Sequence, residues 1–237
     1  MKTHFITFGA GGDNYYDAIN RLGKQAHNIN IFNYISIYTD IYLKNDIEFW
    51  KKHDKFIENN VRGYGYMIWK PYIIKKTMEN MHDGDILLYL DCGCEIDIHK
   101  RDIINYYFEL VKNSYIIDTS TFLEEKAFTK MDLSIFLNMV DDKYLDSEQR
   151  QTGAILFLVC DKTRKLVNEW YDVMCNYNLI DDSPSVNANS VCFVEHRHDQ
   201  SVYSLLLKKH DLFNTQQTLF NCIEYSRNRT GIARFYV

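Results

Sequence analysis

Two apolar runs constrain the fold more than any other feature of this chain. Ile86–Leu90 (ILLYL) and Gly153–Val159 (GAILFLV) show no alternation of polar and apolar residues. A strand with one side in water alternates, so these runs predict strands buried on both faces. A chain of 237 residues with 46% hydrophobic residues can supply the core that such burial needs. The sequence therefore predicts a central sheet covered by helices.

Helical patterns separate the strand patterns along the chain, and no internal repeat is present. This alternation predicts an α/β fold with a single domain over 1–237 and a mostly parallel central sheet flanked by helices. The expected strands are 4–9, 30–38, 86–90, 115–117 and 153–159, and the expected helices are 16–26, 49–57, 70–81, 102–112, 162–176 and 198–210. The segment 124–140 is expected to be helical or irregular, and 181–190 to be a loop.

The bulk charge and the cysteines narrow the class of protein. A net charge of −5 and a pI of about 5.9 argue against a nucleic-acid partner, which usually needs a basic surface. The N-terminal sequence does not have the pattern of a secretory signal, and no run of about twenty apolar residues suggests a membrane span. We therefore expect a cytoplasmic protein whose six cysteines are reduced thiols.

The first apolar run belongs to the stretch DILLYLDCGCE (85–95). Ligands of α/β sheets bind beyond the carboxyl ends of the strands, and Asp91 follows such an end. Its carboxylate suits Mg²⁺ or Mn²⁺, which in turn neutralises a nucleotide diphosphate, and Gly93 lets a ligand approach the backbone. An aspartate that forms a turn is the commoner reason for such a residue, so both interpretations stay open.

Cys92 and Cys94 allow another interpretation, half of a zinc site. Cys192, His196 and His198 are the residues that would complete it. Zinc sites usually separate paired cysteines by two to four residues, so the C-x-C spacing favours small buried side chains instead. A zinc-stabilised interaction domain remains as an alternative, and it predicts stoichiometric zinc in the purified protein.

The segment EHRHDQS (195–201) leads into a helix with an apolar side. Asp199 belongs to the first helical turn, where backbone N–H groups stabilise an anion. Such a carboxylate can act as a general base or stabilise positive charge on a sugar ring, and His198 can bind phosphate or metal. A capping aspartate between exposed histidines is the other interpretation.

Two further groups of cations could meet a phosphate. In RGYGYMIWKP (62–71), Arg62 and Lys70 enclose three aromatic residues at the start of a helix. Helix N-termini bind phosphates and aromatic faces stack on bases or sugars, although a core-packing loop with surface cations has the same pattern. The G-x-G spacing does not continue as a dinucleotide fingerprint, which excludes a nicotinamide cofactor. The tail holds three arginines that could bind a diphosphate together or could simply be solvated charges: Arg227, Arg229 and Arg234.

Four segments, taken in order, resemble the nucleotide-sugar-dependent glycosyltransferases of the GT-A fold. They are RGYGYMIWKP, DILLYLDCGCE, QTGAILF (151–157) and RHDQS (197–201). The similarity is closest to the small single-domain enzymes of bacterial polysaccharide loci and large DNA viruses. It extends over roughly 5–207 and thins over 119–150 and in the tail. The resemblance implies a GT-A-like domain and an enzyme of polysaccharide biosynthesis.

The resemblance also implies a site. The Asp-x-Asp motif of the family maps onto Asp91-Cys92-Gly93, where glycine stands in place of the second acid, and Glu95 and His198 are the candidates to complete a metal site with Asp91. Gly153 maps onto the strand before the acceptor site, and His198 and Asp199 map onto active-site groups near the transferred sugar. The donor contacts implied are Thr7, Phe8, Gly9 and Asp40 for the base, and Arg62 and Lys70 for phosphate or sugar.

The implied reaction is transfer of a sugar from a UDP-, GDP- or dTDP-sugar to a hydroxyl of a glycan or lipid-linked acceptor, assisted by Mn²⁺ or Mg²⁺. The alternative is a non-catalytic nucleotide-sugar or carbohydrate-binding module, which predicts binding without turnover. Residues that select the substrates are expected in 119–150 and 181–196.

Overall fold

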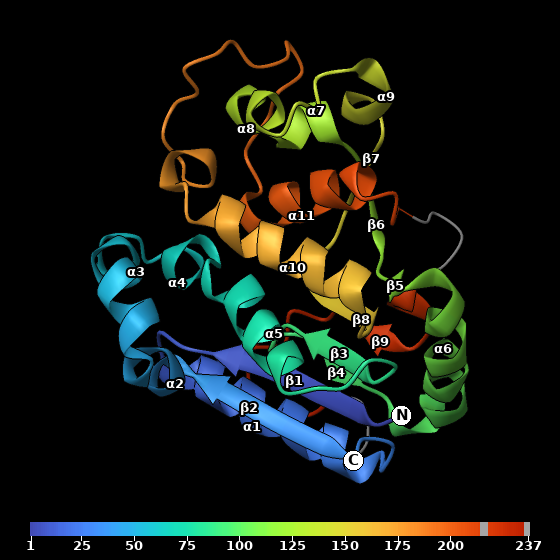
Figure 1. The fold of residues 1–237 in the computed structure, drawn as a ribbon. Helices are drawn as coiled ribbons and strands as arrows, with labels where there is room; N and C mark the ends of the chain where they lie inside the picture. Colours follow the sequence, from blue (N-terminus) through green and yellow to red (C-terminus); the bar gives the residue numbers. More distant parts are fainter. Residues whose placement is uncertain (214–217, 235–237) are drawn as a thin grey trace.

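The centre of the molecule is a five-stranded sheet with the strand order β2-β1-β3-β8-β5 (Figure 1). The computed structural model describes residues 1–213 and 218–234. The strands of this sheet are β1 (Thr3–Gly9), β2 (Tyr34–Thr39), β3 (Ile86–Leu90), β5 (Ile116–Ile117) and β8 (Ala154–Leu158). β8 runs antiparallel to both of its neighbours, and the other four strands point in one direction. The predicted α/β fold with a mostly parallel central sheet is confirmed.

Helices follow the strands along the chain, as the sequence predicted. The helices are α1 (Asp13–Asn28), α2 (Asp40–Asn45), α3 (Ile47–Asn59), α4 (Gly63–Tyr66), α5 (Trp69–Glu79), α6 (Arg101–Ser114), α7 (Glu125–Phe128), α8 (Met131–Phe136), α9 (Asp142–Leu145), α10 (Asp161–Met174) and α11 (His198–Lys209). Two small antiparallel pairs lie outside the main sheet, β4 (Glu95–Ile96) with β9 (Ile223–Glu224) and β6 (Ser120–Glu124) with β7 (Glu148–Arg150). Both pairs are too short to have left a pattern in the sequence.

One predicted boundary is wrong. The strand expected from residue 30 begins only at Tyr34, because Asn30 has a left-handed φ of 52° just after α1 and Asn33 pairs with Thr3. β2 is an edge strand, and its residues are exposed or half-buried.

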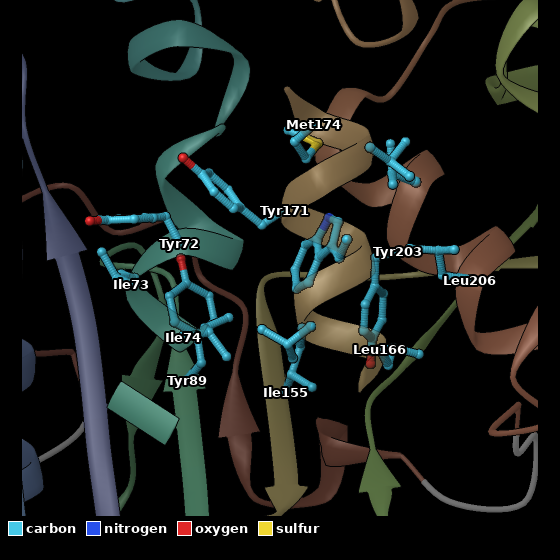
Figure 2. Close-up of a cluster of buried hydrophobic side chains, with 14 of the residues drawn as sticks. Tyr72, Ile73, Ile74, Tyr89, Ile155, Leu166, Tyr171, Met174, Tyr203 and Leu206 are labelled. Atoms are coloured by element: carbon cyan, nitrogen blue, oxygen red, sulfur yellow. The ribbon is translucent and has the colours of Figure 1, made fainter. Parts of the chain in front are cut away.

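The residues of the strands alternate between two hydrophobic layers. On one face, Phe8 and Tyr89 join the apolar sides of α5, α10 and α11. Figure 2 shows this layer, in which α10 lies between α5 and α11. Tyr171 of α10 contacts Tyr72 of α5 with ring centroids 5.2 Å apart, and Trp170 contacts Tyr203 of α11 at 4.9 Å. On the other face, Phe5 and Leu88 pack against α1 and α6. This double coverage explains the unbroken apolar sequences of β3 and β8.

The strand directions bring several loops to one edge of the sheet. Gly9 pairs with Thr39, so β1 and β2 end together, and Leu90 pairs with Ala154, so the start of β8 lies beside the end of β3. Asp40, Asp91 and Gly153 therefore belong to the same edge, the carboxyl edge. The short helices α7, α8 and α9 lie beyond α11, at the end of the molecule away from β2 (Figure 1).

Candidate active site

A buried ammonium group joins two carboxylates at the carboxyl edge. Lys70 Nζ lies 3.2 Å from Asp91 Oδ1 and 2.8 Å from Asp199 Oδ2. The side chains of Lys70 and Asp199 are each 2% exposed, whereas that of Asp91 is 43% exposed. Three residues that the sequence singled out separately thus form one cluster, and Asp91 is its member that faces solvent.

The backbone before α5 explains how Lys70 reaches this position. Tyr64, Gly65, Tyr66 and Met67 all have left-handed φ values between 51° and 81°, which turns the chain sharply before α5 begins. Glycine is required at position 65, because a Cβ there would lie 2.7 Å from Ile57 Cγ1. The indole of Trp69 donates to the Gly63 carbonyl at 2.9 Å and fixes the turn. Lys70 then points from the first turn of α5 to the carboxyl edge.

Neighbouring hydrogen bonds hold the two carboxylates. The Thr152 hydroxyl donates to Asp199 Oδ2 at 2.8 Å, and Lys70 Nζ lies 3.2 Å from the same hydroxyl. Trp170 Nε1 donates to the Asp199 carbonyl at 3.1 Å. The Tyr89 hydroxyl donates to Asp91 Oδ1. These bonds leave the cluster little freedom to rearrange.

The charges of the cluster depend on one another. Burial on its own would lower the pKa of the Lys70 ammonium, but Asp199 and Asp91 outweigh burial, so this pKa lies above its ordinary value. Lys70 is therefore charged at neutral pH. Burial and the adjacent Asp91 raise the pKa of the Tyr89 hydroxyl well above its usual range, so it remains a donor.

Gly93 faces the C-terminal tail instead of open space. A Cβ at this position would lie 3.1 Å from Arg227 Cα, and Asn228 N donates to the Gly93 carbonyl at 2.9 Å. A side chain at position 93 would therefore crowd the tail backbone.

Glu95 does not replace the missing acid. Its carboxylate is fully buried and accepts hydrogen bonds from Asn228 Nδ2 at 2.9 Å and from the backbone N–H of Arg234 at 2.8 Å. Arg21 lies 3.3 Å away and also donates to carbonyls of the tail and of the Cys92 loop. Glu95 therefore ties the tail to α1, and the expectation that it ligates a metal is wrong.

His198 is buried, which rules out the interpretation of exposed histidines around a capping aspartate. Its Nδ1 donates to the Ile180 carbonyl at 2.7 Å, which leaves Nε2 as the acceptor of a neutral ring. Burial, the largest influence, lowers the pKa of His198. No donor or acceptor among residues 1–213 and 218–234 forms a hydrogen bond with Nε2, and Asp182 Oδ1 lies 3.8 Å from it.

Arg62 lies beside His198 and not beside Lys70. Its guanidinium contacts Asp182 at 3.1 Å and Glu195 at 3.7 Å, and the Tyr66 hydroxyl donates to Asp182 at 3.0 Å. Arg62 therefore joins the turn before α5 to the 181–195 loop.

The residues predicted to bind the base make contacts within the protein that support the fold. Thr7 and Phe8 are buried, and Phe8 stacks on Trp69 with ring centroids 3.9 Å apart. A Cβ on Gly9 would lie 2.8 Å from the Tyr15 carbonyl, so α1 packs directly on this position. Asp40 accepts from Tyr16 and Lys44, both at 2.7 Å. Contact with a base through these side chains stays a prediction.

The described part of the chain contains no group of three or more His, Cys, Asp or Glu side chains that could hold a metal ion. The cysteines of the zinc alternative differ in their environments, since Cys94 is buried and Cys192 is exposed. Burial raises the pKa of Cys92 to about 11, with Asp91 acting in the same direction. Burial also raises the pKa of Cys94 well above its usual range.

Two residues of the cluster were missed by the sequence analysis. Thr152 and Tyr89 lie inside the motifs QTGAILF and DILLYLDCGCE, but neither was singled out as a site residue. The only signal was position: Tyr89 stands two residues before Asp91, and Thr152 directly precedes Gly153.

Among the solved structures that are similar to this chain are three glycosyltransferases. Mouse xyloside xylosyltransferase 1 has 9% identity and a TM-score of 0.45, over 91% of this chain and 85% of that one. The galactosyltransferase LgtC has 14% identity and a TM-score of 0.43, over 85% and 70%. A glycosyltransferase involved in glycosylation of the PBCV-1 major capsid has 9% identity and a TM-score of 0.41, over 73% and 66%.

No protein-family model and no curated protein sequence matches the chain. The likeness to the solved structures concerns the course of the chain and assigns no role to any residue. Among the described helices, none combines the length and the apolarity needed to cross a bilayer.

Proposed function

We propose that this chain is a single glycosyltransferase domain (1–237) that moves a sugar from a nucleotide-diphosphate sugar to a hydroxyl of a glycan or lipid-linked acceptor. The observation that supports it most is the Lys70 ammonium between Asp91 and Asp199 at the carboxyl edge. Ligands of α/β sheets bind at this edge, and a fixed cation there can offset the charge of a departing diphosphate.

In the proposed reaction, the bond between the anomeric carbon and the diphosphate oxygen breaks, and its electron pair leaves with the diphosphate. The acceptor oxygen forms the new bond to the anomeric carbon and gives its proton to an active-site carboxylate. Asp91 is the exposed candidate for this base, and Asp199 is the buried one. Both carboxylates also stabilise the positive charge that develops on the sugar ring.

The remaining candidates have supporting parts in this proposal. Arg229 of the tail follows Asn228, whose backbone N–H contacts Gly93, and its guanidinium is exposed. Its charge is close enough to lower the pKa of Cys92, the residue after Asp91, so we propose that it meets the diphosphate. His198 Nε2 and Arg62 flank the 181–195 loop, where we expect the acceptor or the sugar to be selected.

The test is a donor panel. Purified protein is incubated with UDP-, GDP- and dTDP-sugars, with Mn²⁺ and separately with EDTA, and release of nucleoside diphosphate is measured by chromatography. We expect release from at least one donor, and a loss of at least about 100-fold in Asp91→Asn. Asp97→Asn is the matched control, since Asp97 caps a turn after β4 and lies outside the cluster.

Two results would contradict the proposal. One is binding of a donor with no release of diphosphate under any condition, which the binding-module alternative predicts. The other is full turnover in an Asp91→Ala, Asp199→Ala double variant that is folded by circular dichroism.

A further inference from the structure

We infer that the Lys70 ammonium is the resident cation of the donor site and takes the place of a divalent metal, so that nucleoside diphosphates bind without one. The inference rests on the proposed function and deepens it. It departs from the Mn²⁺ or Mg²⁺ that the resemblance implies, and it is argued from the residues of this chain alone.

The first argument is space and charge at the two acids. A metal ion that bridged Asp91 Oδ1 and Asp199 Oδ2 would lie about 2.1 Å from each oxygen. Lys70 Nζ already lies 3.2 Å and 2.8 Å from these same oxygens, so the ion would have to displace the ammonium. Lys70 is 2% exposed, and moving its charge elsewhere in the core would cost free energy without a new partner.

The second argument is the supply of ligands. Mg²⁺ and Mn²⁺ are usually held by one or two carboxylates together with waters and substrate phosphates, and with Lys70 in place Asp199 is not free to serve as one of them. Gly93 stands where the resemblance places a second acid, and a side chain there would crowd the backbone of Arg227, 3.1 Å from its Cβ. Glu95 is buried under the tail, and His198 Nε2 faces Asp182. Across 1–213 and 218–234, no third ligand joins Asp91.

The third argument is that cations are already present where a diphosphate would lie. Lys70 lies beneath Asp91 and offsets the charge of the two acids, and the tail adds Arg227 and Arg229, both exposed. The Arg229 guanidinium stacks over Tyr15 with its carbon 5.2 Å from the ring centroid. The tail that crowds position 93 therefore also brings positive charge to Gly93.

The test measures binding, independently of turnover. UDP, GDP and dTDP are titrated into the full chain in a calorimeter, once in EDTA and once in about 1 mM Mn²⁺. We expect at least one nucleotide to bind with a Kd that changes less than about threefold between the two conditions. A Kd that is more than about tenfold weaker in EDTA overturns the inference but leaves the proposed function intact. Failure of all three nucleotides in both conditions contradicts the proposed function itself.

A second readout needs no nucleotide. Mn²⁺ alone is titrated into the wild type and into Lys70→Ala, and bound Mn²⁺ is followed by electron paramagnetic resonance. The wild type is expected to bind no stoichiometric Mn²⁺, whereas Lys70→Ala frees Asp91 and Asp199 and binds it. Stoichiometric Mn²⁺ in the wild type overturns the inference, even if the variant does not fold.

A matched control separates this effect from the loss of a buried lysine. Lys208 is also buried and lies 2.7 Å from the carboxylate of Glu125, toward the opposite end of α11 from Asp199. Lys208→Ala should lose stability yet keep metal-independent nucleotide binding and acquire no Mn²⁺ site. Equal Mn²⁺ binding by both lysine variants would overturn the inference.

Discussion

Gly93 lies directly beneath the backbone of Arg227, with only 3.1 Å between Arg227 Cα and the position of a Cβ on residue 93. This contact links the motif at the end of β3 to the C-terminal tail. A side chain at position 93 would therefore press against the backbone of the tail.

Gly93→Asp is therefore expected to displace the tail and not to create a metal site. Crowding against backbone cannot be relieved by a side-chain rotation, so we expect a loss of about 1–3 kcal/mol in the free energy of unfolding. Chemical denaturation measures it. Gly231→Ala is the control, because a Cβ there meets Asp17 at an ordinary 3.6 Å. A Gly93→Asp protein as stable as the wild type that binds Mn²⁺ would contradict this expectation.

Thr152 is predicted to position Asp199 and, through it, Lys70. Thr152→Val removes the 2.8 Å hydrogen bond to the buried carboxylate, which should lower stability by about 1.5–3 kcal/mol. Thr152→Ser keeps the hydroxyl and should restore most of it. The kcat is expected to fall more in Thr152→Val than in Thr152→Ser, and the KM for the donor is expected to change less than kcat. Equal kcat in the valine and serine variants would show that the hydroxyl does not matter.

Arg229 is predicted to contact the donor diphosphate. Arg229→Ala should weaken nucleoside diphosphate binding by about five- to tenfold, since an exposed ion pair contributes on the order of 1 kcal/mol. The loss should shrink as salt is raised from 50 to about 500 mM, because salt screens the interaction. Arg101→Ala, on the α6 side of the molecule, should leave the affinity unchanged. Titration calorimetry compares the two, and an equal effect would contradict the assignment.

His53 is predicted to make stability depend on pH. Its ring is buried and pairs with the hydroxyls of Tyr177 and Tyr171, each at 2.8 Å. Burial, with a smaller contribution from Lys52, lowers the pKa of His53 from 6.5 to about 4. The unfolded chain thus takes up the proton first, so stability is fully present above pH 6.5 and is lost as the pH falls towards about 4.

Urea denaturation between pH 8 and pH 4 tests this dependence. His53→Gln should be less stable at pH 8 but should have a shallower slope below pH 6.5, because the titrating group is gone. The exposed His99→Gln variant should keep the slope of the wild type. An unchanged slope in His53→Gln would show that other groups cause the acid lability.

The sequence predicted the sheet because burial on both faces demands unbroken apolar strands, and Ile86–Leu90 satisfies that demand in any orientation. For the same reason it could not predict that β8 runs antiparallel to β3, since an apolar strand has the same composition in either direction. That direction matters, because it brings Thr152 and Gly153 to the carboxyl edge beside Asp91.

The sequence predicted which charged residues belong to the candidate site, but it did not predict how they are arranged. Asp91, Asp199 and Lys70 each belonged to a motif, yet nothing in their spacing indicated that the lysine would lie between the two acids. That arrangement depends on the left-handed turn before α5 and on the packing of α11, both of which are tertiary. Gly93 was interpreted as room for a ligand, and the structure instead fills the space with the tail.

The most direct test of the central claim is a crystal structure of the protein with a bound nucleoside diphosphate, grown in EDTA with the tightest binder among UDP, GDP and dTDP. The account predicts the diphosphate at the carboxyl edge, above the Lys70 ammonium and within hydrogen-bond distance of Arg229. A nucleotide bound away from this edge, such as in the surface hollow lined by Asn20, Lys24 and His27 on α1, would contradict it.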